Sequence, residues 1–167
     1  MVTFILPGKS AKNKVWLDEC AAKIQFDGIV RAVSWEHWLD PEEKFDVEVK
    51  ATTISRHTKG DTINIIAHSV STLITALIIE QIPKQINKVI LCGIPLDVFS
   101  DSEKETIKKS LMGLEQEKLI VFQNTNDPHA SFDEVRKLLP ESIKVISKER
   151  SGHDYPYFED FDNFLNS

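Results

Sequence analysis

Six short apolar segments recur along this chain, and longer segments with helical spacing separate them. The first apolar segment, residues 2–6, is closed by Pro7 and Gly8, which is typical of a strand buried on both faces. The other five are residues 28–34, 62–67, 88–93, 118–123 and 143–147. Helical spacing falls at residues 15–24, 45–55, 70–82, 102–110, 132–139 and 157–165. This alternation predicts an α/β fold, with a doubly wound, mainly parallel sheet of six strands and ligands beyond the carboxyl ends of the strands.

The size and composition of the chain predict one globular domain over residues 1–167. Hydrophobic residues make up 41% of the 167 residues and charged residues 28%, which suffices for a single core. The formal net charge of −6 and the scattered lysines provide no basic surface, which excludes nucleic acid as a partner. The apolar N-terminus lacks a basic leader and is too short for a signal peptide or membrane span. We therefore expect a soluble cytoplasmic protein that does not associate with membranes.

Neither a metal nor a cofactor is expected from the sequence. Cys20 and Cys92 lie in apolar surroundings without CxxC spacing, and we interpret both as reduced core residues. No group of His, Cys, Asp and Glu has the ligand spacing of a zinc site. The pair Gly8-Lys9 lacks the upstream glycine of a phosphate-binding loop.

A serine stands where the third predicted strand turns into a helix. Residues 62–67 pass almost directly into Ser69 and then into an apolar helical segment. This arrangement is typical of a nucleophile elbow, whose tight turn requires small residues two positions before and after the serine. Ala67 and Ser71 are both small, although neither is glycine. The alternative interpretation makes Ser69 the N-cap of the helix, a common position for serine.

An aspartate and a histidine follow two later strands at matching positions. Asp127 comes after the fifth predicted strand and His153 after the sixth, so both are expected at the same edge of the sheet as Ser69. A serine hydroxyl needs a neutral imidazole to take its proton, and the imidazole needs a carboxylate to fix its tautomer. His129, two residues after Asp127, is the alternative base, and Asp97, after the fourth strand, is the alternative acid.

These motifs resemble those of the α/β-hydrolase family, and the resemblance spans nearly the whole chain. It covers the first strand and turn (4–8), the elbow (66–71), the acid turn (126–128) and the histidine loop (151–154). The order serine, acid, histidine is also the order of the family's triad. The resemblance implies a small member without a lid, because only residues 94–114 are available between two strands. It also implies a sheet that lacks the family's first two antiparallel strands.

The resemblance further implies an oxyanion hole of two backbone N–H groups. One comes from the residue after the nucleophile, Val70, and the other from the loop after the first strand. Pro7 has no N–H, so Lys9 is the first choice for the second donor and Gly8 is the alternative. The side chain of Lys9 is interpreted as solvated, and attraction of an anionic substrate is the alternative.

Three further side chains receive roles from their position. His68 stands next to the nucleophile on a tight turn, so its side chain is expected to point away from Ser69 in a structural role. Trp35 and Trp38 follow the second strand at the reactive edge of the sheet, and they are expected either to wall an acyl pocket or to belong to the core.

The sequence thus predicts a serine hydrolase with Ser69 as nucleophile, His153 as base and Asp127 as orienting acid. An open site favours hydrolysis of a small carboxylic ester or thioester through an acyl-enzyme intermediate. Two alternatives stay open. One is a binding or scaffold protein that keeps the fold without activity. The other is a flavodoxin-like nucleotide binder, which explains the strands but not the ordered serine, aspartate and histidine.

Overall fold

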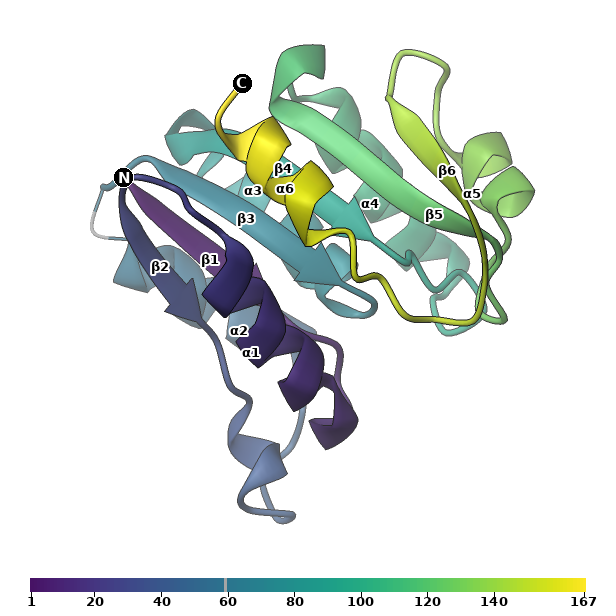
Figure 1. Cartoon of the computed structure of the whole chain (residues 1–167). Coiled ribbons are helices and arrows are strands. Elements are labelled where there is room, and N and C mark those ends of the chain that lie inside the picture. The colour runs from purple at the N-terminus through teal and green to yellow at the C-terminus, as the bar shows by residue number, and fades with distance from the viewer. Residues whose placement is uncertain (59) are drawn as a thin grey trace.

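The computed structural model describes residues 1–58 and 60–167, and these residues form one sheet of six strands. The strands are β1 (Val2–Leu6), β2 (Ile29–Ala32), β3 (Ile63–His68), β4 (Ile86–Cys92), β5 (Leu119–Asn126) and β6 (Val145–Ser151). They lie in the order β2-β1-β3-β4-β5-β6, and every neighbouring pair is parallel (Figure 1). The predicted α/β fold with a parallel six-stranded sheet is therefore confirmed.

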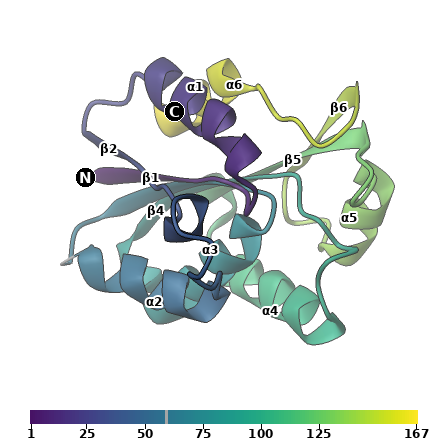
Figure 2. The same cartoon turned by 90° about the horizontal axis from the view of Figure 1, so that it is seen from below.

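Helices cover both faces of the sheet (Figure 2). One face carries α1 (Lys14–Lys23) and α6 (Phe158–Leu165), and the other carries α2 (Val47–His57), α3 (Ser71–Gln81), α4 (Asp101–Met112) and α5 (Phe132–Leu138). The short 3-10 helices are η1 (Ala11–Asn13), η2 (Glu36–Trp38), η3 (Pro83–Gln85) and η4 (Gln116–Lys118). Within residues 1–58 and 60–167, no helix combines the length and apolarity needed to cross a bilayer.

The apolar core is divided by the sheet into two layers. Successive side chains of β3 alternate between them, so that Ile63 and Ile65 face α2 to α5 whereas Ile66 faces α1 and α6. Cys20 and Cys92 both belong to the second layer, where they are buried and not joined in a disulfide. Burial raises the pKa of both thiols, so they remain protonated and unreactive, as core cysteines do.

The two edge strands differ in detail from the sequence prediction. Strand β2 is shorter than the predicted 28–34, and its side chains are mostly exposed rather than covered on both faces, because it has a neighbouring strand only on the side of β1. Strand β6 starts after the predicted residue 143 but continues to Ser151. It does so because β5 also extends, through polar residues, as far as Asn126, which pairs with Ser151. Because Asn126 and Ser151 are paired, the loops that follow β5 and β6 begin side by side.

The order of the strands fixes where the loops of interest meet. The chain goes from β1 outward to β2 and then returns to β3 on the other side of β1. The carboxyl ends of β1 and β3 therefore flank the point at which the strand order reverses, the usual position of a ligand site in open α/β sheets. The loop at residues 7–10 leaves β1 there, and the turn at Ser69 leaves β3 beside it.

Candidate active site

The turn at Ser69 has the backbone conformation of a nucleophile elbow. Strand β3 ends at His68, α3 begins at Ser71, and Ser69 between them has a φ of 60°. It is the one non-glycine residue with a positive φ in the described part of the chain, and such a conformation typically costs about 1–3 kcal/mol. The neighbours that must be small, Ala67 and Ser71, are fully buried, and the Ser71 hydroxyl donates to the Pro7 carbonyl at 2.5 Å.

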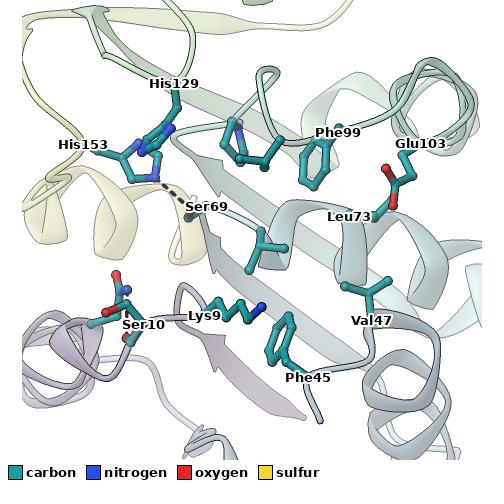
Figure 3. A pocket seen from close by; sticks show the side chains of 14 residues that line it. Lys9, Ser10, Phe45, Val47, Ser69, Leu73, Phe99, Glu103, His129 and His153 are labelled. Carbon is teal, nitrogen blue, oxygen red and sulfur yellow. Dashed lines mark hydrogen bonds between the residues drawn. The ribbon is translucent and has the colours of Figure 1, made fainter. Parts of the chain in front are cut away.

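The Ser69 hydroxyl does not cap helix α3. The N-cap position is occupied by Val70, and no side chain caps this helix end. Instead, Ser69 Oγ lies 2.8 Å from Nε2 of His153, the pair joined by the dashed line in Figure 3. The N-cap interpretation of Ser69 is therefore wrong, because the tight turn aims the hydroxyl away from the first helical N–H groups.

His153 connects Ser69 to a buried carboxylate. It lies in the loop after β6, and its Nδ1 is 2.7 Å from Oδ2 of Asp127, which follows β5. The structure thus brings the three residues from separate strand ends into one hydrogen-bonded series, serine to imidazole to carboxylate. With Asp127 ionised, Nδ1 carries the proton and Nε2 is left as the acceptor for the serine hydroxyl.

The surroundings of Asp127 keep its carboxylate ionised. Burial opposes the charge, but hydrogen bonds from His153, from the Tyr155 hydroxyl at 2.6 Å and from the His129 backbone N–H at 2.8 Å outweigh it. The pKa of Asp127 is accordingly held below its usual value. Burial also raises the pKa of Tyr155, so its hydroxyl stays protonated and serves as a donor.

The candidate alternatives, His129 and Asp97, pair with each other. His129 Nδ1 lies 3.0 Å from Oδ2 of Asp97, and the Asp97 backbone N–H donates to the His129 carbonyl at 3.2 Å. The His129 ring packs edge-on against the ring of His153, with 4.6 Å between the centroids. Neither side chain is hydrogen-bonded to Ser69, so the second histidine–aspartate pair borders the site without joining the series of three.

His68 is a buried neighbour of the base. Its ring lies between those of Trp16 and His153, at centroid distances of 5.0 and 4.9 Å. Burial, with a smaller contribution from His153, lowers the pKa of His68 to about 3, so the ring is neutral. Its two nitrogens have no hydrogen-bond partner among the described residues. The His153 ring thus packs against both the His68 ring and the His129 ring.

Comparison with known proteins gives matches in structure only. No protein-family model matches the chain, and no curated protein matches its sequence. A YdeN-like hydrolase of Pectobacterium atrosepticum matches with a TM-score of 0.68 and 16% identity over 99% of this chain and 91% of its own. A monoacylglycerol lipase of Paleococcus ferrophilus matches with a TM-score of 0.64 and 12% identity, over 99% of this chain and 94% of its own. Est1E of Butyrivibrio proteoclasticus, solved with ferulic acid bound, matches with a TM-score of 0.64 and 12% identity, over 98% of this chain and 86% of its own.

The chain has the α/β-hydrolase fold. The match extends over nearly the whole chain, so the six parallel strands are a truncated version of that fold, as the sequence implies. Residues 94–118, where larger relatives are expected to insert a lid, hold only α4 and the short η4. The Ser69 turn is consequently reached from solvent through an open cavity.

The predicted oxyanion donors lie beside the nucleophile in this α/β-hydrolase fold. Lys9 and Val70 both line the cavity that contains Ser69 and His153. Gly8 does not line this cavity, and a side chain there would collide with Asn13, since an added Cβ would lie 2.7 Å from its Nδ2. Of the three residues expected to supply oxyanion donors, Lys9 and Val70 therefore line the cavity and Gly8 does not.

Trp35 and Trp38 do not line this cavity, and Trp35 belongs to the core, which is the other interpretation of its sequence position. The indole N–H groups of both residues donate to the loop that follows β1. Trp35 donates to the Pro7 carbonyl at 3.2 Å, and Trp38 donates to the Lys9 carbonyl at 2.7 Å. His37 Nε2 lies 2.7 Å from the same Lys9 carbonyl. Because the carbonyls point toward these side chains, the loop has a defined conformation.

The cavity at Ser69 has a volume of about 440 Å³ (Figure 3). Its apolar walls are Phe45, Val47, Val70, Leu73, Pro95, Val98 and Phe99, and its polar walls are Lys9, Ser10, Asn13, Glu103 and His129. An apolar cleft with a few polar groups suits a small acyl group. In the described part of the chain, no group of His, Cys, Asp and Glu could hold a metal ion.

Sequence reasoning missed two residues that hold the histidine loop. Asn124, inside β5, donates through its amide to the carbonyls of Gly152 and Asp154 at 2.9 and 3.0 Å. The Tyr155 hydroxyl accepts a hydrogen bond from the backbone N–H of Asn124 at 3.0 Å and donates one to Asp127. An asparagine in an apolar strand is the signal that points to Asn124, because a buried amide needs partners.

A third missed residue is Gly93, at the end of β4. Its φ is 65°, and an added Cβ would lie 2.6 Å from the Tyr155 ring and 3.0 Å from Cε1 of His153. A side chain at this position would therefore displace both rings. A glycine at the end of a buried strand is the signal for such a close approach.

Proposed function

We propose that the protein is a serine hydrolase that cleaves small carboxylic esters or thioesters through an acyl-enzyme intermediate. The observation that carries the proposal is the series from Ser69 in its left-handed turn, through His153 at 2.8 Å, to buried Asp127 at 2.7 Å. Few structural roles would require a strained serine bonded to a histidine whose other nitrogen faces a carboxylate. The hydrolases, esterases and lipases that share the fold support hydrolysis in general.

Acylation follows from the order of the hydrogen bonds. As Ser69 Oγ attacks the ester carbonyl carbon, its proton passes to Nε2 of His153, and Asp127 stabilises the imidazolium. The tetrahedral intermediate then collapses, the bond to the alcohol or thiol breaks, and His153 returns the proton to the leaving group. Water, deprotonated by the same imidazole, next attacks the acyl carbon. The bond from this carbon to Ser69 Oγ then breaks, His153 returns the proton to Oγ, and the carboxylic acid leaves.

The negative charge of each tetrahedral intermediate needs two donors. We assign them to the backbone N–H groups of Val70 and Lys9, because both residues line the cavity that contains Ser69. Trp35 and Trp38 support this role indirectly, because their bonds to the carbonyls of the loop hold its peptide groups in place. Such preorganised donors are typically worth about 10²–10³-fold in kcat each.

Labelling with a fluorophosphonate tests the proposal directly. Only a serine activated by a neutral imidazole reacts readily with such a probe, so we expect stoichiometric labelling of the native protein. Peptide mass spectrometry should place the adduct on Ser69. An inactive scaffold with the same fold would remain unlabelled while staying folded, and that result would refute the proposed function.

The pH dependence of ester hydrolysis provides a second prediction. His153 must be neutral to accept the serine proton, so kcat/KM for a small aryl ester should rise with pH as this imidazole loses its proton. Asp127 should not produce this rise, because its pKa lies below the usual carboxyl value. His153→Ala should remove nearly all turnover, and any residual activity should lack the rise.

His129→Ala is the matched control for this pH profile. His129 pairs with Asp97 and is not bonded to Ser69, so its removal should keep the pH-dependent rise and change kcat/KM less than tenfold, a change below about 1.4 kcal/mol. A profile that survives in His153→Ala but disappears in His129→Ala would transfer the role of the base to His129.

A further inference from the structure

The side chain of Lys9 is exposed to solvent and lines the active-site cavity. Figure 3 shows it extending from the loop that follows β1 toward Phe45. Its ammonium lies 5.7 Å from the centroid of the Phe45 ring, within range of a cation–π contact. The Phe45 ring is in turn packed edge-on against Trp35 and His37, at 5.5 and 5.1 Å. The backbone of Lys9 is held by the bonds to its carbonyl, and its ammonium lies beside this ring.

The Lys9 ammonium has no anionic partner. Within residues 1–58 and 60–167, no carboxylate lies within 4.0 Å of it, and it donates no hydrogen bond. An ammonium group has three donors, and here they face a cavity whose walls are mainly apolar. Such a cation is available to an anionic group of a bound molecule, because no ion pair has to be broken first.

The other charged groups of the cavity already have partners. Glu103 accepts the backbone N–H of Ser100 at 2.7 Å and its hydroxyl at 2.9 Å, in the capping box of α4. His129 faces Asp97. Figure 3 shows Glu103 across the cavity from Lys9. Lys9 is thus the one charged group of the cavity left for a substrate in the described part of the chain.

The direction of the chemistry places this cation on the acyl side. His153 must give a proton to the leaving group, so the alcohol or thiol lies next to His153 and His129. The acyl chain then extends the other way, into the apolar part of the cavity that contains Phe45. An anion within reach of Lys9 would therefore belong to the acyl chain.

We propose that Lys9 selects acyl groups that end in a carboxylate, so that the preferred substrates are half-esters or half-thioesters of short dicarboxylic acids. This inference rests on the proposed hydrolase function of the same site. The apolar walls would contact the methylene chain, and the ammonium would form a charge-assisted hydrogen bond to the terminal carboxylate. The same ammonium disfavours long alkyl chains, because an apolar chain past Phe45 would desolvate it without compensation.

The test compares matched pairs of phenyl esters. Monophenyl succinate, glutarate and adipate are measured at neutral pH against phenyl butanoate, pentanoate and hexanoate, with uncatalysed hydrolysis subtracted. The wild-type protein should show a kcat/KM ratio in favour of the half-ester for at least one chain length, about tenfold, and added salt should reduce that ratio. Lys9→Met should abolish the preference, whereas Lys9→Arg should retain it.

Two further variants control for charge. Glu103→Gln keeps a capping-box side chain but removes a negative charge from the cavity, so it should raise the ratio. Lys12 lies outside this cavity, so Lys12→Met should leave the ratio at the wild-type value. A wild-type ratio of one or below, or a ratio equal in wild type and Lys9→Met, would overturn the inference. Failure of the proposed function is a different result, namely no turnover of either ester class and no fluorophosphonate labelling.

Discussion

Ser69→Ala is expected to abolish hydrolysis of small esters, with a loss of kcat on the order of 10⁴–10⁶-fold. Without the hydroxyl there is no nucleophile and no acyl-enzyme, and only water attack aided by the oxyanion donors remains. The variant should also fail to react with fluorophosphonate. The measurements are steady-state kinetics on a phenyl ester and labelling under native conditions.

Thermal unfolding distinguishes this chemical role from a structural one. Ser69 does not cap α3, so Ser69→Ala should change the melting temperature by no more than a few degrees. Ser69→Gly should be equally inactive yet more stable than Ser69→Ala by about 1 kcal/mol, because glycine adopts the observed φ of 60° without strain. If Ser69→Ala unfolded the protein while wild type remained unlabelled and inactive, the serine would serve the turn and not catalysis.

The location of Ser69, Asp127 and His153 could be predicted from sequence, because the regular alternation of strands and helices determines which edge of the sheet each residue reaches. Each residue follows a separate apolar segment, and the ends of parallel strands all face the same edge. The prediction needed only the alternation of strands and helices, and not the bounds of any one strand. The extension of β5 and β6 through polar residues was therefore missed without consequence for the site.

The supporting contacts could not be predicted, because they depend on distances between loops. Trp35 and Trp38 were expected in the cavity wall or in the core, and their indole N–H groups donate to loop carbonyls 28 and 29 positions earlier in the chain. Periodicity places both at the correct edge of the sheet and says nothing about where each ring points. The proximity of the Lys9 ammonium to Phe45 is likewise a contact between distant segments, because Phe45 reaches the cavity from the segment before α2.

The pairing of His129 with Asp97 illustrates the same limit. Either residue could replace a member of the triad when judged by its position after a strand, and both do lie at the reactive edge. The structure distinguishes the two aspartates. Asp127 is buried and bonded to His153, whereas Asp97 is half-exposed and bonded to His129. Burial of the carboxylate, which the sequence does not reveal, decides which aspartate can orient the imidazole bonded to Ser69.

Asp127→Asn is expected to lower kcat/KM for a phenyl ester by about 10⁴-fold at neutral pH. With its carbonyl oxygen at the position of Oδ1, the asparagine keeps the bond from the His129 backbone N–H, and its NH₂ group then takes the position of Oδ2, to which Tyr155 and His153 are bonded in the wild type. Facing His153, the NH₂ group imposes the tautomer whose Nε2 carries the proton and cannot accept one from Ser69. The lost activity would then reflect the wrong tautomer and not a disrupted fold, which circular dichroism would verify.

The stability of Asp127→Asn should depend on pH in a direction that the hydrogen bonds determine. Asp127 has a lowered pKa, so its stabilising contribution is present above the unfolded-state value of about 3.9 and is lost as the pH falls through the lower folded value. The wild-type protein should therefore be more stable than Asp127→Asn at neutral pH, and the difference should shrink in acid. Asp97→Asn should keep kcat/KM within tenfold. If Asp97→Asn removed turnover and Asp127→Asn did not, the orienting acid would be Asp97, acting through His129, and His153 would lose its assigned role.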